Sequence, residues 1–265
     1  MNTKTLTPRS ISVVDQYLHF RIGSAECSVP YFNNKTTGAR ASLPVYVGKG
    51  SPREIFEEIQ SFMLNDGIKA DLLTDQSLKK LLVEKGIGID CSGFSYYVLN
   101  AESEETGKGS LSKHISFIRA RGILGTIACK LHPEKNTDVA TLAHDKNSRI
   151  IPLGEVRPGD MITMRYADKN NLEAKQKGER NHILIIHQVE YQNFIPVKIH
   201  YSHAIAYPED GIYGTGVRQG TIEISQTTTS ILGGIWTEDG KSDADNRIFT
   251  YASRAQTELR RLKWM

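Results

Sequence analysis

The sequence has few cysteines, no glycine-rich phosphate loop and no long apolar run. Its three cysteines, Cys27, Cys91 and Cys129, form no CxxC pair, so neither a disulfide framework nor a zinc knuckle is indicated. GxGxxG and GxxxxGK[ST] motifs are absent, which argues against nucleotide chemistry. The aliphatic run at residues 183–186 is far shorter than the ~18 residues that a membrane-spanning helix needs.

Excess charge of either sign is also lacking. The chain of 265 residues has 33 Lys and Arg against 30 Asp and Glu, and this net charge of +3 gives no support to nucleic-acid binding. Residues 1–20 interleave polar residues where a signal peptide would carry an apolar run. We therefore predict no export signal and no membrane span, with a cytoplasmic location by default and a cell-wall or extracellular one only by another route. The oligomeric state is left open.

Helical patterns come before strand patterns along the chain. Ser51, Pro52 and Glu54 form a helix-start signature, and a second amphipathic stretch follows Asp75. Four strands are predicted later, at residues 161–166, 183–191, 197–206 and 217–224. This order predicts an α+β fold in which helices pack on an antiparallel sheet.

The chain divides into three predicted parts. Residues 1–75 form an N-terminal extension, irregular at first, with a helical part packed on the core. Residues 76–226 form the core, with polar surface insertions at 102–150 and 167–181. Residues 227–265 form a C-terminal extension that ends in a basic amphipathic helix at 254–265, where Arg260 and Arg261 belong to a solvated face.

Cys91 has the most informative surroundings of the three cysteines. Asp90 is a suitable N-cap, which places Cys91 in the first turn of a core-facing helix. The positive end of the helix dipole favours a thiolate there, and free N–H groups could bind an oxyanion. The competing interpretation is a small buried residue, which is the one we adopt for Cys27 and Cys129.

A base for this thiol is sought among the histidines. A hairpin centred between Gln192 and Asn193 places His182 opposite His203 on one face, while His187 and His200 point to the other face. An imidazole base held by a second polar group is the arrangement of a Cys-His-polar triad. A shift of the hairpin would break this pairing, so His200 remains an alternative third residue.

Together these residues resemble the NlpC-type cell-wall peptidases, which have the papain-like cysteine peptidase fold. The resemblance rests on Asp90-Cys91-Ser92-Gly93-Phe94, then Arg157-Pro158-Gly159-Asp160, then His182 before an aliphatic strand, and His203-Ala204 on the next strand. It covers roughly residues 88–226. The resemblance implies that Cys91 is the nucleophile, His182 the general base and acid, and His203 the orienting third residue. It also implies amide hydrolysis in peptidoglycan stem peptides through an acyl-enzyme, without a metal or organic cofactor.

The family often carries a tyrosine and a Gly-Gly pair before its DCSG element, and residues 83–88 offer neither. Tyr31 is the upstream candidate for that place, and Asp90 and Ser92 complete the candidates for substrate or oxyanion contacts.

Two other functions use the same fold. A thioester can also be intercepted by an amine, which is acyltransferase chemistry. A non-catalytic binding module would retain Cys91 without turnover. A zinc site made of Cys91, His182 and His203 is a further, less favoured arrangement.

Overall fold

The computed structural model describes residues 1–33, 43–166, 180–242 and 245–265. One sheet runs through it in the order β10-β9-β8-β7-β6-β5-β11-β4, with β1 pairing β6 beside this path, and a small β2-β3 pair lies apart. All of these strand pairs are antiparallel. The structure therefore confirms a mixed α+β chain with an antiparallel sheet.

Three helices begin where the sequence predicts. A capping box between Ser51 and Glu54 starts α2, Thr74 caps α3, and Asp90 caps α4. The α-helices are α1 (Pro8–Leu18), α2 (Pro52–Asn65), α3 (Asp75–Glu84), α4 (Cys91–Glu105), α5 (Gly122–Leu131), α6 (Pro133–Asn136), α7 (Val139–Leu142) and α9 (Arg247–Arg254).

The four predicted strands are confirmed as β5, β6, β7 and β8. The strands are β1 (Asn2–Thr5), β2 (Phe20–Ile22), β3 (Ala25–Cys27), β4 (Ser148–Ile150), β5 (Met161–Arg165), β6 (His182–Gln192), β7 (Ile195–Ile205), β8 (Gly216–Glu223), β9 (Ile235–Glu238), β10 (Lys241–Ser242) and β11 (Gln256–Leu262).

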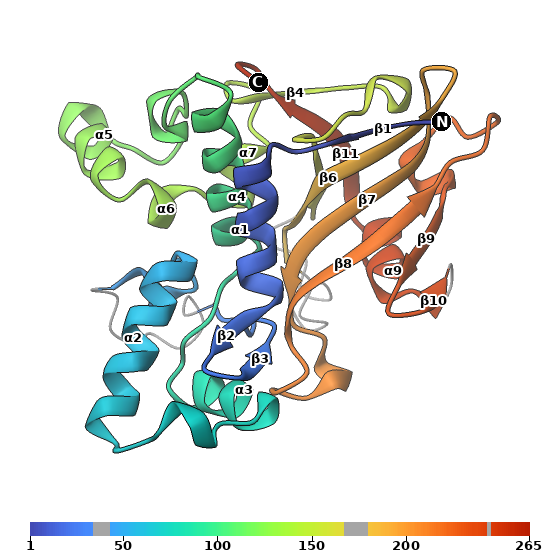
Figure 1. Cartoon of the computed structure of the whole chain (residues 1–265). Helices are drawn as coiled ribbons and strands as arrows, with labels where there is room; N and C mark the ends of the chain where they lie inside the picture. Colours follow the sequence, from blue (N-terminus) through green and yellow to red (C-terminus); the bar gives the residue numbers. More distant parts are fainter. Residues whose placement is uncertain (34–42, 167–179, 243–244) are drawn as a thin grey trace.

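The sheet has a hydrophobic core on each face. Helices α1 to α4 contribute to the larger one, which Ile183 and Ile185 of β6 also enter. Leu184 and Ile186 of the same strand enter the second core with Trp236 and residues of α9. Helices α1 and α4 lie on one side of the sheet and α9 on the other (Figure 1). Both faces of β6 are buried, which explains its continuous aliphatic sequence.

Segments predicted as extensions contribute to the same sheet. The opening residues form β1 and α1, although the sequence predicted an irregular start, and β1 pairs with β6. Helix α1 begins with Pro8 at its first position but without a side-chain cap from Thr7. Its stability comes instead from Val14 and Tyr17, which are buried in the larger core.

The predicted basic helix at 254–265 is wrong, because most of this segment forms β11 between β5 and β4. Arg260 and Arg261 are 2% and 8% exposed rather than solvated. Arg261 donates to both oxygens of Asp160, at 2.7 and 2.8 Å, and Arg260 pairs with Glu258. Sheet pairing on both sides thus overrides the helical pattern.

The first predicted insertion is more ordered than a set of surface loops. Residues 102–150 hold the end of α4, the helices α5, α6 and α7, and the edge strand β4. Of the second insertion, residues 167–179 lie outside the described residues. Among the helices described, none has both the length and the apolar character needed to cross a membrane.

Candidate active site

Helix α4 begins against two neighbouring segments that fix its first turn. Asp90 Oδ1 accepts a hydrogen bond from the N–H of Gly93 at 2.6 Å, which caps the helix. A Cβ on Gly93 would lie 2.6 Å from the carbonyl oxygen of Gly48, so this position of the DCSG element requires glycine. Cys91 is consequently held as the first residue of a rigid helix.

A buried lysine compensates the negative charge of the Asp90 carboxylate that caps α4. Lys49 is 2% exposed, and its Nζ donates to Asp90 Oδ1 at 2.9 Å, to Ser92 Oγ and to the carbonyl oxygen of Thr137. Ser92 Oγ in turn donates to Asp90 Oδ1 at 2.9 Å. The side chains of Asp90 and Ser92, predicted as substrate or oxyanion candidates, are thus engaged with Lys49 beside the thiol, and their substrate role stays a prediction.

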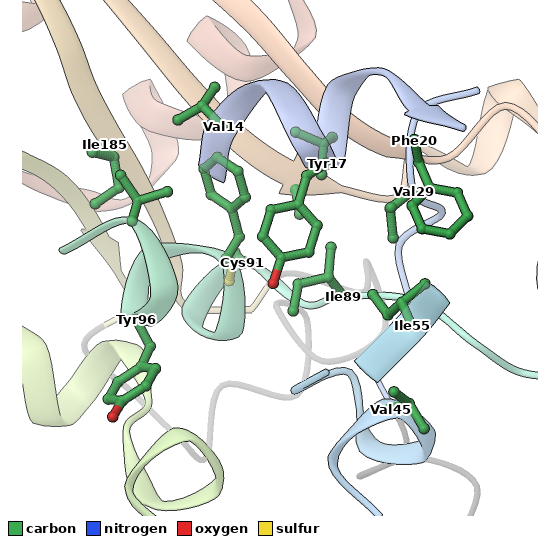
Figure 2. Packing of buried hydrophobic residues seen from close by; sticks show 14 of the residues in the cluster. Val14, Tyr17, Phe20, Val29, Val45, Ile55, Ile89, Cys91, Tyr96 and Ile185 are labelled. Atoms are coloured by element: carbon green, nitrogen blue, oxygen red, sulfur yellow. The ribbon is translucent and has the colours of Figure 1, made fainter. Parts of the chain in front are cut away.

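The Cys91 thiol lies where α4 meets the start of β6. The backbone N–H groups of Ile183 and Ser92 lie near its sulfur and favour the thiolate. The residue is 6% exposed, and Figure 2 shows it in the buried cluster with Tyr17 and Ile89. Burial raises the pKa of the thiol to about 12, with a further increase from Asp90 that Lys49 and the N–H groups only partly oppose.

This pKa differs from the expectation of a helix-activated thiolate. Desolvation disfavours the charged sulfur more strongly than the helix terminus favours it. Burial also lowers the pKa of His182 well below 6.5, and the neighbouring His203 lowers it further. The resting pair is therefore a neutral thiol beside a neutral imidazole.

His182 and His203 meet as predicted, but through a different register. Asn193 and Phe194 have φ angles of 51° and 65°, so the hairpin turn lies one residue later than predicted. Ile185 pairs with Ser202 and Gln192 with Ile195, which makes the two histidines diagonal rather than direct neighbours. Their rings still contact, with His182 Nε2 2.8 Å from His203 Nδ1.

The two histidines lie on the side of the sheet that faces the second core. Strand alternation places His182 with Leu184 and Ile186, on the side of the second core. Its ring lies 5.9 Å from that of Tyr251, which packs against the same core. His182 is the first residue of β6, and the next residue, Ile183, has its backbone N–H near the Cys91 sulfur.

Glu238 extends the histidine pair and was not found from the sequence. Its Oε2 lies 2.7 Å from His203 Nε2, and its Oε1 accepts from the Tyr207 hydroxyl at 3.0 Å. Its pKa is lowered, since the favourable effects of His203 and Tyr207 exceed the cost of burial. The sequence does carry a signal for Glu238: Trp236, two residues earlier, lies on the same face of the strand and indicates that this face is buried. A carboxylate on a buried face needs a partner.

The carboxylate determines which ring nitrogens carry protons. An ionised Glu238 only accepts, so a neutral His203 carries its proton on Nε2 and accepts at Nδ1. His182 then donates from Nε2, which leaves its Nδ1 unprotonated. Among the described residues, Nδ1 of His182 has no hydrogen-bond partner, so it can act as a base.

Tyr31 comes to this site from far upstream in the chain. It forms a parallel bridge with Ile89, two residues before Cys91, and the N–H of Phe32 donates to the carbonyl oxygen of Ile89 at 3.2 Å. Burial raises the pKa of the Tyr31 hydroxyl, and the proximity of Cys91 raises it further. Tyr31 is thus near the thiol, in a position where it can contact a substrate.

His187 and His200 form a separate cluster. A bulge makes His187 an extra residue on β6, and its Nδ1 lies 2.9 Å from Ser202 Oγ. His200 Nε2 pairs with Glu190 Oε1 at 2.7 Å. Since His203 rather than His200 contacts His182, the geometry favours His203 as the orienting residue.

In the part of the chain that the structure describes, no three His, Cys, Asp or Glu side chains are grouped to hold a metal ion. Comparison of the chain with family models, with curated proteins and with solved structures finds no match.

Proposed function

We propose that this protein is a cysteine amidohydrolase of papain-like fold, similar to NlpC-type peptidases, that cleaves amide bonds in peptidoglycan stem peptides. The observation that carries the proposal is the hydrogen-bonded series Glu238–His203–His182, which leaves an unprotonated imidazole nitrogen at the strand start that contacts Cys91. A thiol, a base and an orienting group in this order are the components of nucleophilic acyl transfer.

The reaction starts from the neutral pair. His182 Nδ1 takes the thiol proton as the sulfur of Cys91 attacks the amide carbon, and Glu238 stabilises the resulting imidazolium through His203. His182 then gives this proton to the leaving amine, which yields a thioester. Water attacks the thioester with His182 again as base, releasing the carboxylate product and restoring the thiol.

The first turn of α4 supplies the oxyanion contact. N–H groups at a helix start have no partner one turn earlier, and Cys91 and Ser92 are the first two residues of α4. Tyr31, which lies near the thiol, contacts the substrate side chain. In the NlpC-type peptidases that the chain resembles, that side chain belongs to a diamino acid.

Incubation with a panel of muropeptides, followed by mass spectrometry, tests the proposal. We expect cleavage by the wild type, loss of cleavage in Cys91→Ala and unchanged cleavage in Cys27→Ala, the matched cysteine control. Products that incorporate an added amine would indicate acyl transfer instead of hydrolysis. The proposal fails if Cys91→Ala cleaves as well as the wild type, or if the wild type leaves every muropeptide intact.

A further inference from the structure

Helix α5 turns its apolar side outward. Ile123, Leu124, Ile127 and Leu131 are 81%, 82%, 50% and 71% exposed, and they fall within an arc of about 100° on the helix. Cys129, on the opposite side, packs against the larger core. A surface helix normally buries its apolar side, so α5 has the reverse orientation.

The chain around this helix is strongly cationic. Residues 106–133 contain five Lys and Arg and no Asp or Glu, whereas the rest of the sequence carries a net charge of −2. Lys130 and Arg121 are exposed at the two ends of α5. An apolar stripe bordered by cations is typical of helices that lie in the plane of a membrane surface.

The position of α5 leaves its outer side accessible. It projects at the edge of the molecule, on the side away from the sheet (Figure 1). The chain after it returns to the candidate site, where the carbonyl oxygen of Thr137 accepts from Lys49 Nζ at 3.2 Å. A partner surface that binds α5 would therefore lie on the helical side of the protein. The chain that follows α5 leads from this side to the Cys91 region.

We propose that α5 is an in-plane anchor that binds the surface of membranes containing anionic lipids. The four aliphatic side chains enter the boundary between headgroups and acyl chains, while Arg121 and Lys130 contact the lipid phosphates. A second copy of this chain fits less well, because its α5 would bring the same cations together. The proposal concerns binding alone and does not depend on the reaction at Cys91.

Vesicle flotation with the full chain tests the anchor. The probes are vesicles of phosphatidylcholine alone and vesicles with roughly one-third phosphatidylglycerol. We expect binding to the anionic vesicles that weakens as salt rises from about 0.1 M to about 0.5 M. Ile123→Ser/Leu124→Ser should reduce this binding about tenfold or more, since both side chains lose apolar area that would leave water. Arg121→Gln/Lys130→Gln should also weaken it, and only on anionic vesicles.

Leu64→Ser/Leu72→Ser is the matched control, because these two leucines are 83% and 74% exposed elsewhere on the surface. This variant should bind like the wild type. Absence of wild-type binding, or equal loss in both double-serine variants, would overturn the proposal. So would concentration-dependent dimerisation in sedimentation velocity that Ile123→Ser/Leu124→Ser abolishes without any vesicle binding, since α5 would then be an interface between copies.

Discussion

Replacement of Glu238 by glutamine tests the proton arrangement on which the proposed chemistry depends. The carboxylate requires an N–H at His203 Nε2, and this fixes the free nitrogen of His182 two hydrogen bonds away. Glutamine keeps the size of the side chain and removes its charge. It can also turn its NH₂ group toward His203, which would reverse both tautomers and protonate the nitrogen that serves as base.

The expected loss follows from the distances. Hydrogen bonds of 2.7 and 2.8 Å on either side of the His203 ring place the Glu238 charge about 8 Å from an imidazolium at His182. At an effective dielectric constant of about 20, the attraction is about 2 kcal/mol, or about 30-fold in rate. Reversal of the tautomers would raise the loss further, toward the ~10⁴-fold seen when a triad carboxylate becomes an amide.

The assay is single-turnover cleavage of the muropeptide that the wild type cleaves. Glu190→Gln is the matched control, because Glu190 makes a 2.7 Å contact with His200 in the other histidine cluster. It should leave the rate unchanged, and the nitrogen NMR shifts of His182 and His203 should change only in Glu238→Gln. A loss below about threefold in a folded Glu238→Gln protein would refute the reasoning, because the calculated charge effect alone exceeds it.

Three further predictions concern pH and stability. Activity should be flat from about pH 6.5 to 9 and fall only in acid, because the pKa of His182 lies well below 6.5 and that of Cys91 is about 12; pH–rate profiles check this. Lys49→Met should cost about 3–5 kcal/mol in urea unfolding, since it leaves Asp90 buried and unpaired. Burial lowers the pKa of His187 to about 4, so between pH 6.5 and 4 the unfolded chain binds a proton that the folded chain does not. Folding stability therefore decreases as the pH is lowered through this range. In His187→Gln, the thermal unfolding midpoint should change less with pH.

Each of these has an outcome that contradicts it. A bell-shaped profile with an alkaline limb below pH 9 would indicate a resting thiolate–imidazolium pair rather than the neutral one. Lys49→Met/Asp90→Asn should recover part of the stability lost in Lys49→Met, and strictly additive losses would show that the two groups are not coupled. An unaltered pH dependence in His187→Gln would mean that other groups cause the acid destabilisation.

Local signals predicted the helix starts and the central strands well. Ser51 with Glu54, and Asp90 before Cys91, specify caps through contacts within a few residues, so the sequence states them directly. The predicted helix in the C-terminal segment is wrong because Arg260 and Arg261 indicate a solvated surface in the sequence, whereas both are buried. Only the acidic partners that the fold brings to them, such as Asp160, make buried arginines possible there.

The hairpin illustrates a prediction that holds for a different reason. Its turn lies at Asn193 and Phe194, and a bulge at His187 changes the register again, features that depend on backbone geometry and neighbouring strands. At Ile185 and Ser202 the pairing is two residues from the predicted one, which keeps His182 and His203 on one face. His182 and His203 therefore still meet, as diagonal neighbours.

The sequence by itself determined the α+β order, the cap that begins α4 at Cys91 and the two histidines on adjacent strands, because caps and alternation are local. The tertiary structure decided the rest. It brought Tyr31 and Lys49 to the thiol, added Glu238 behind His203 and raised the pKa of Cys91 through burial. These depend on contacts between distant segments and on exclusion of water, which no local pattern of residues specifies.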